Sequence, residues 1–186
     1  MKNNQFELTR KFWSEEIIRG NLEWPDENVI RFVKRNFKQN STILDFGCGA
    51  GRNAIALAKD GYEVIAMDYT EAALKKVKEN SKLLNIDIKK NYDVDIPLKE
   101  NSIDAVVACG SMFYHNKEET LKLLTSIKMV LKDKGKFWAD WRTKEDWLFL
   151  HTIQIDECLY ALDDSSQRKN ATYSFFEENE LREMYE

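Results

Sequence analysis

The sequence has few of the residues that build covalent or metal-bound frameworks. Among its 186 residues are 3 cysteines, 2 histidines and 2 prolines. The cysteine count is odd and no CxxC spacing occurs, which argues against a disulfide framework or a zinc site and indicates a reducing compartment. We therefore expect no metal site. No apolar run is long enough for a membrane span, and the N-terminal residues lack the apolar core of a signal peptide. These features predict a cytoplasmic protein without a membrane partner.

A strong charge of either sign is also missing. The chain has 28 Lys and Arg against 32 Asp and Glu, for a formal net charge of -4. No basic footprint for nucleic acid stands out, and the lysine clusters at 75–78 and 89–90 are more typical of solvated helix and loop surfaces. We expect no nucleic-acid partner.

What is present is the composition of one globular domain. Hydrophobic residues make up 43% and charged residues 32% of a chain whose length fits a single domain. Short apolar runs alternate with helical patterns. The strand-length runs are Thr42–Phe46, Glu63–Met67, Ile86–Tyr92, Ile103–Cys109 and Lys136–Trp141, and the helical patterns between them are Asn53–Lys59, Thr70–Leu84 and Lys117–Leu131.

This alternation predicts an α/β fold. Strands that are apolar on both faces are typical of a parallel sheet that is covered on two sides. We expect a Rossmann-like, doubly wound and mostly parallel sheet of about five strands, with helices on both faces. We also expect no antiparallel strand pair at the C-terminal end, because no strand pattern follows the last helical segment.

A glycine-rich turn directly follows the first expected strand. Gly47, Gly49 and Gly51 stand in the stretch ILDFGCGAGRN, where they permit positive φ and remove Cβ atoms that would keep a ligand from the main chain. A dinucleotide fingerprint, GxGxxG, would need its third glycine at Arg52. The acid ahead of the turn, Asp45, would repel a pyrophosphate but can hold an ammonium group. The pattern therefore favours a ligand with a cationic amino-acid end.

From about Trp24 to Trp141 the sequence resembles the class I S-adenosylmethionine-dependent methyltransferases of the small-molecule type. The glycine-rich turn matches their first motif, Asp68 matches the acid that binds both ribose hydroxyls, and Asp93 matches the acid near the adenine amino group, a role that Val94 or Asp95 could share. The resemblance implies S-adenosyl-L-methionine as the cofactor. The cofactor-binding residues that it implies are Asp45, Gly47, Gly49, Gly51, Asn53, Asp68, Tyr69, Asp93, Val94 and Cys109.

The candidates for catalysis are His115 and Tyr114, just past the fourth strand, where the acceptor pocket opens in this family. His115 could act as a base, or it could be a loop histidine that packs on the next helix. Tyr114 could wall the transfer site or belong to the core. Arg142 could pair a carboxylate or phosphate of the substrate, or form a surface salt bridge. The Pro-Pro-Tyr signature of base methylation is absent after the fourth strand, so we expect a small-molecule acceptor.

The resemblance also divides the single domain of residues 1–186. We expect an N-terminal helical cap over 1–38, which closes over the cofactor, a cofactor-binding core over 42–141, an insertion over the acceptor site at 142–176, and a last, truncated helix at 177–186. A sheet that ends at its fifth strand has a bare edge, which predicts a homodimer. The alternative function is a cofactor-binding module with weak or no catalysis and a regulatory or partner-binding role.

Overall fold

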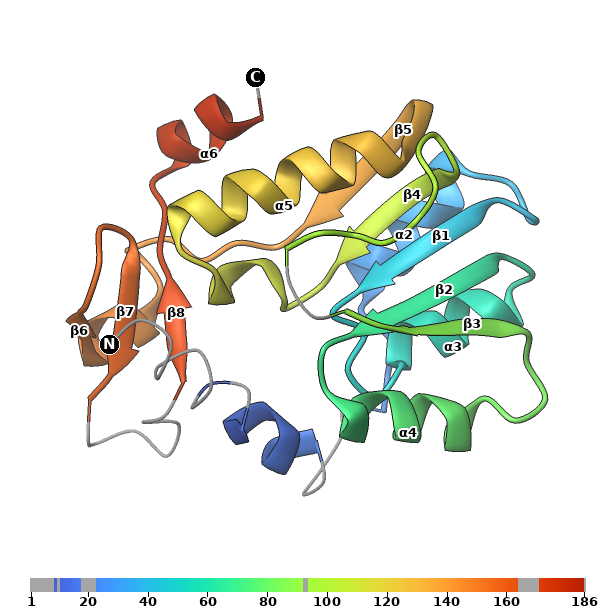
Figure 1. Cartoon of the computed structure of the whole chain (residues 1–186), viewed down its shortest axis with the longest axis horizontal. Helices are drawn as coiled ribbons and strands as arrows, with labels where there is room; N and C mark the ends of the chain where they lie inside the picture. Colours follow the sequence, from blue (N-terminus) through green and yellow to red (C-terminus); the bar gives the residue numbers. More distant parts are fainter. Residues whose placement is uncertain (1–8, 10, 18–22, 92–93, 164–170, 186) are drawn as a thin grey trace.

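The structure is a computed structural model that describes residues 9, 11–17, 23–91, 94–163 and 171–185. Five parallel strands form its main sheet, in the order β3-β2-β1-β4-β5 (Figure 1). The chain places β2 and β3 on one side of β1 and then crosses to the other side, where β4 pairs with β1. The strand order thus reverses between β1 and β4, which is where ligands bind in such sheets. The strands are β1 (Thr42–Phe46), β2 (Glu63–Asp68), β3 (Ile86–Lys90), β4 (Ile103–Ala108) and β5 (Leu131–Ala139).

Helices cover both faces of this sheet because successive strand residues point to opposite sides. In β1, Ile43 packs with α2 (Glu27–Asn36), α3 (Arg52–Lys59) and α4 (Glu71–Asn80). Its neighbour Leu44 packs in a second core, to which α5 (Lys117–Val130) contributes Leu123, Ile127 and Val130. The main sheet is therefore the middle layer of three.

Polar side chains define where these helices begin. The Asp26 carboxylate accepts hydrogen bonds from the backbone at the start of α2, and the Thr70 hydroxyl accepts one from Ala73 in α4. At α5, Asn116 and Glu119 form a capping box in which each side chain bonds the backbone of the other residue. Such caps satisfy amides that have no partner inside the helix.

The expected lack of antiparallel strands after the fifth strand is wrong. The structure has a separate antiparallel sheet in the order β6-β7-β8, preceded by the 3-10 helix η2 (Trp147–His151) and followed by α6 (Glu178–Met184) (Figure 1). Its strands are only three or four residues long, so none shows a readable alternation of apolar and polar side chains. They are β6 (Thr152–Gln154), β7 (Leu159–Leu162) and β8 (Thr172–Ser174).

The small sheet packs on distant parts of the chain through aromatic side chains. Phe12, from the helical residues 11–17, is buried in one cluster with Phe113 of the 3-10 helix η1 (Met112–Tyr114) and with Tyr173 of β8. The hydroxyls of Thr9 and Thr172 lie 3.1 Å apart and are buried. Thus the described part of the N-terminal segment packs against the small sheet.

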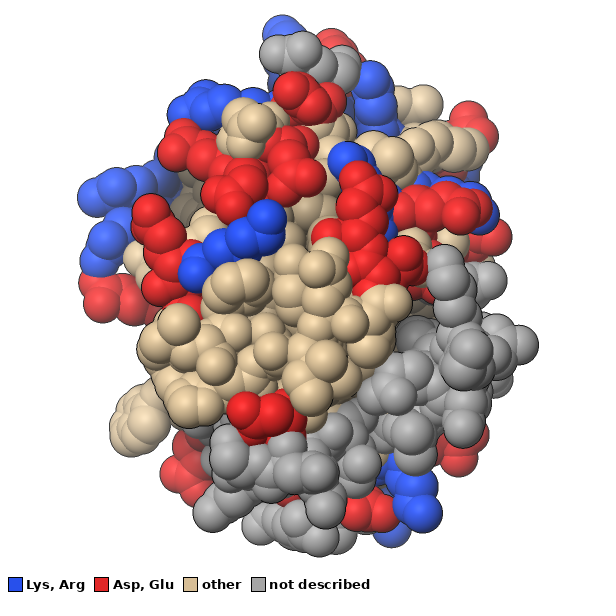
Figure 2. Space-filling model, turned by 90° about the vertical axis from the view of Figure 1, so that its left-hand side faces the viewer, with Lys and Arg blue, Asp and Glu red and all other residues tan. Residues whose placement is uncertain are grey.

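The outer end of the small sheet is apolar. Trp147, Leu150 and Ile153 are 70%, 82% and 62% exposed. Figure 2 shows a broad area without charged residues on this side of the molecule. Among the described residues, no helix combines the length and apolar character that crossing a bilayer requires.

Candidate functional site

The glycine-rich turn lies at the carboxyl end of β1, beside the point where the strand order reverses. The Gly47 and Cys48 amides both donate to the Met67 carbonyl of β2, at 2.8 and 3.0 Å. Gly47, Gly49 and Gly51 have φ of 70°, 53° and 87°. All three therefore adopt the left-handed conformation that glycine accepts most readily.

The three glycines differ in what surrounds them. A Cβ on Gly47 would lie 2.3 Å from Cβ of Ser111, and one on Gly51 would lie 2.9 Å from a methyl group of Val77. A Cβ on Gly49 would meet nothing within 4 Å. Gly47 and Gly51 therefore permit close packing inside the protein, whereas Gly49 leaves backbone open to a ligand.

Ser111 joins the ends of the two central strands. Its hydroxyl donates to the Phe46 carbonyl at 2.9 Å, and its Cβ lies against Gly47. No pattern in the sequence singled out this residue, because the contact depends on β4 lying next to β1. The weak signal that could have identified it is a small polar residue three positions beyond the end of β4.

Two buried carboxylates flank the turn. Asp68 accepts hydrogen bonds from the Gly49 amide at 2.9 Å and from the Thr70 amide and hydroxyl at 2.8 Å. Asp45 accepts one from the Ala54 amide at 3.0 Å. Burial raises the pKa of both carboxyls above the ordinary value, and that of Asp45 rises to about 7. A cationic ligand beside them would favour their charged forms.

Cys109 and Asp140 lie at the carboxyl ends of β4 and β5. The Arg52 guanidinium lies 3.4 Å from the Cys109 sulfur. The Asp140 carboxylate accepts a hydrogen bond of 2.6 Å from the Gly110 amide. Burial, with Asp140 nearby, raises the pKa of the Cys109 thiol to about 12, so the thiol contacts its neighbours in the protonated form.

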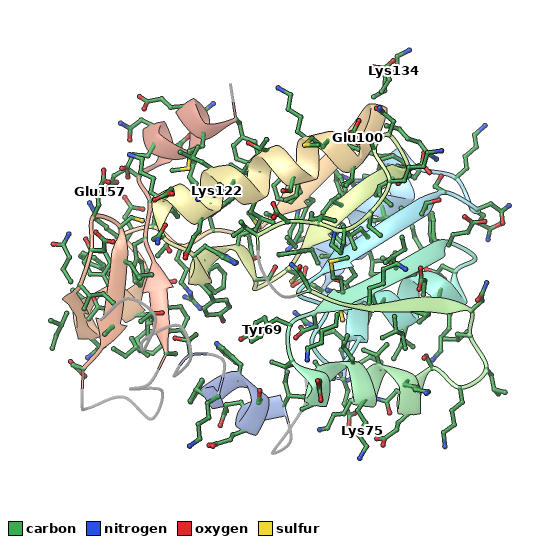
Figure 3. All side chains as sticks on the ribbon, viewed as in Figure 1. Tyr69, Lys75, Glu100, Lys122, Lys134 and Glu157 are labelled. Atoms are coloured by element: carbon green, nitrogen blue, oxygen red, sulfur yellow. The ribbon has the colours of Figure 1, made fainter. Side chains whose placement is uncertain are left out.

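The structure describes two further expected cofactor residues, Asn53 and Val94, inside the protein. The side-chain oxygen Oδ1 of Asn53 accepts a hydrogen bond of 2.8 Å from the Asp26 amide, which ties α3 to the start of α2. Val94 is buried in the core on the α5 side of the sheet. Asp93 lies outside the described residues. Tyr69 follows β2, and Figure 3 shows its side chain pointing toward the side that carries the small sheet.

The two expected catalytic residues are consecutive and lie at the end of η1, after β4. The His115 ring nitrogen Nδ1 is 3.4 Å from the Met112 carbonyl, and the Ser174 hydroxyl donates to the His115 carbonyl. The Tyr114 ring centre lies 5.4 Å from that of Trp13 and 5.3 Å from that of Tyr173. Tyr114 thus belongs to the aromatic cluster, while His115 links η1 to the small sheet.

Comparison with known proteins identifies the protein family of this chain. The family model described as a methyltransferase domain matches residues 43–135, half of the chain, which includes the glycine-rich turn, all of β1 but its first residue, and all of β2 to β4. The chain belongs to this family. It is an S-adenosylmethionine-dependent methyltransferase domain, and its cofactor is S-adenosyl-L-methionine.

Individual relatives agree with this class. A phosphoethanolamine N-methyltransferase of Triticum aestivum is 31% identical over 71% of this chain and 24% of its own length. An uncharacterized methyltransferase of Schizosaccharomyces pombe is 34% identical over 64% of this chain and 47% of its own. The chain thus spans about a quarter to a half of these relatives. A solved S-adenosylmethionine-dependent methyltransferase of Methanosarcina mazei shares the fold, with a TM-score of 0.72 at 20% identity, over 82% of this chain and 81% of that one.

The glycines give a matched pair of substitutions. Gly47→Ala and Gly49→Ala both place a Cβ at positive φ, but only Gly47→Ala also brings it 2.3 Å from Ser111. We expect Gly47→Ala to lower the free energy of unfolding by about 1–3 kcal/mol more than Gly49→Ala, because overpacking adds to backbone strain. Urea denaturation measures both. Adding Ser111→Gly to Gly47→Ala should recover part of the loss, and equal losses for the two alanine variants would contradict the proposed clash.

Asp45 predicts a pH dependence of stability. Its carboxyl keeps its proton in the folded protein up to about pH 7, whereas an unfolded chain loses it near pH 4. Ionisation in the unfolded state therefore favours unfolding increasingly as the pH rises through this window. We expect Asp45→Asn to remove this dependence. Relative to wild type, its free energy of unfolding should rise by up to ~1.4 kcal/mol per pH unit and then level off above the window. Denaturation at pH 5, 6, 7 and 8 checks this, and a difference that is constant with pH would refute it.

Proposed function

We propose that this protein transfers the methyl group of S-adenosyl-L-methionine to a small-molecule acceptor. The observation that carries the proposal is the open backbone of Gly49, whose amide is bonded to the buried Asp68 where the strand order reverses. The net charge of -4 favours a small molecule over nucleic acid. Three of the relatives are phosphoethanolamine N-methyltransferases, whose named acceptor is a small molecule.

In this proposal the two buried acids hold opposite parts of the cofactor. Asp68 accepts hydrogen bonds from the ribose hydroxyls, which a carboxylate can do with both oxygens. Asp45 faces the ammonium group of the amino-acid end. Since burial raises the pKa of Asp45 to about 7, binding of that cation is accompanied by loss of a proton from the carboxyl near neutral pH. Tyr69, Cys109 and the glycines complete the proposed site.

The transfer step needs little chemistry from the protein. Bound S-adenosyl-L-methionine, held by Asp45, Asp68 and Gly49, would supply an activated methyl group, which a lone pair of the acceptor would take while the electrons of the carbon–sulfur bond stay on sulfur as S-adenosylhomocysteine leaves. The protein aligns the acceptor and excludes water. His115 is the proposed base for an acceptor that loses a proton, and Tyr114 walls the site.

Asp68→Asn tests the cofactor site. An amide oxygen accepts less strongly from the ribose hydroxyls than a carboxylate, so we expect the affinity for S-adenosylhomocysteine to fall about 10- to 100-fold. Calorimetric titration measures it, with NAD titrated in parallel. Asp104→Asn is the matched control, because Asp104 is at the opposite, amino end of β4. Comparable binding of NAD, or an unchanged affinity in Asp68→Asn, would rule out the proposal. Tight cofactor binding without methyl transfer to a panel of amines, alcohols and thiols would favour the alternative of a non-catalytic module.

We also propose that two copies associate, and the side chains on the two sheet edges favour the small sheet as the contact. The edge strand β5 of the main sheet carries Lys132, Lys134 and Lys136, and lysines oppose the pairing of edges. The edge strand β6 carries the exposed Ile153 beside the exposed Trp147 and Leu150. An exposed apolar patch on a sheet edge is typical of an association surface.

Ile153→Lys tests this contact. Sedimentation velocity should show dimers of the wild type at high concentration and monomers of Ile153→Lys, because the lysine would bury its charge against the apolar face of the other copy. Leu83→Lys is the control, since Leu83 is 99% exposed beyond α4. A wild type that stays monomeric, or an Ile153→Lys variant that still dimerises, would disprove the contact.

A further inference from the structure

Two buried hydrogen-bond donors beside η1 have no partner among the described residues. The Tyr173 side chain is completely buried, and its hydroxyl makes no hydrogen bond to any residue that the structure describes. The Nε atom of Arg142 is also buried and has no partner within the same described ranges. Leaving a buried donor unpaired destabilises the folded protein, so two of them in one place need an explanation.

The guanidinium of Arg142 is held in a fixed plane. Its central carbon lies 4.7 Å from the ring centre of Phe113 and 5.2 Å from that of Tyr173. Its Nη1 atom is paired with the carboxylate of Asp146, which also caps η2 by accepting the Leu148 amide at 2.9 Å. One end of the guanidinium is thus anchored, and the Nε–H edge is left for another partner.

This arrangement adjoins the proposed transfer site. Phe113 lies in η1, two residues after Ser111, which packs on Gly47 of the glycine-rich turn. The Tyr173 ring is 6.0 Å from that of Phe113 and 5.3 Å from that of Tyr114. The two unpartnered donors therefore belong to the aromatic cluster that borders the mouth of the site.

We propose that Arg142 and Tyr173 bind an oxyanion of the acceptor, either a carboxylate or a phosphate, through Nε–H and O–H. The inference rests on the proposed function and adds the chemical class of its acceptor. An arginine presents the Nε–H edge of its planar fork to such groups, and charge-assisted bonds to oxyanions are stronger than bonds to neutral oxygens. The phenol hydroxyl of Tyr173, whose ring lies against the same guanidinium, supplies a further donor. The acceptor would thus be fixed at its anionic end, with its other end free to face the methyl group.

Small anions test this site without knowledge of the acceptor. The probes are acetate, inorganic phosphate and acetamide, which has nearly the shape of acetate but no charge, all at constant ionic strength. We expect acetate or phosphate, but not acetamide, to raise the melting temperature of the wild type in a saturable way. The response to the two anions tells which oxyanion the site prefers.

The variants separate binding from structure. Tyr173→Phe removes only the hydroxyl, so it should not lower the melting temperature without anion, yet it should raise the half-saturating anion concentration about tenfold. Arg142→Lys keeps the charge but lacks Nε–H and should have a similar effect. Tyr160→Phe is the matched control, because Tyr160 lies directly opposite Tyr173 in the small sheet. It should respond as the wild type does.

Three results would overturn the proposal: no response of the wild type to either anion, an equal response to acetamide, or an unchanged response in Tyr173→Phe. Calorimetric binding of S-adenosylhomocysteine is measured on the same samples. Failure of that binding would overturn the proposed function, whereas normal cofactor binding without an anion response would overturn this inference alone.

Discussion

The close approach of Gly47 to Ser111 is the contact on which the rest of the site depends. It brings the main chain after β1 against the main chain after β4, at the place where the strand order reverses. The same contact fixes Ser111, the residue that directly precedes η1. Gly51 allows a similar approach between the start of α3 and Val77 of α4. Because two of the three glycines are occupied by packing, the third, Gly49, is the one whose backbone remains accessible.

The electrostatics of the site follow from this packing. The carboxylates of Asp45 and Asp68 are buried because the strands that carry them lie between two layers of helices. Backbone amides satisfy their hydrogen bonds but do not neutralise them. The charged form of a buried acid costs free energy in the unliganded protein. A bound cation beside the acid stabilises that charged form, so such acids favour a cationic ligand. A sulfonium cofactor with an ammonium group supplies that kind of charge.

The sequence predicted those parts of the fold that depend on local pattern. The strands β1 to β4 were expected from apolar runs, and the glycine-rich turn from its place directly after the first of them. The site roles of Asp45, from its place ahead of the turn, and of Asp68, from the resemblance to the methyltransferases, stay predictions. The small sheet was not, because its strands are too short for a period of two to be visible. The contact of Ser111 with Gly47, and that of Asn53 with Asp26, depend on which elements become neighbours in space. Spacing along the chain contains no such information. The start of β5 at Leu131 was also missed, since Lys134 at positive φ interrupts the strand pattern.

The aromatic cluster has a consequence for the order of folding. Thr9 and Thr172, which touch beside it, are 163 residues apart, whereas β1, β2 and β3 pair within a much shorter stretch of chain. Contacts between distant segments form late, because closing a long loop costs entropy that only later contacts offset. The residues of β1, β2 and β3 are therefore all made long before residue 172, whose hydroxyl touches that of Thr9. In that order of folding, the main sheet that carries the proposed cofactor site would form before the aromatic cluster that borders the proposed acceptor site.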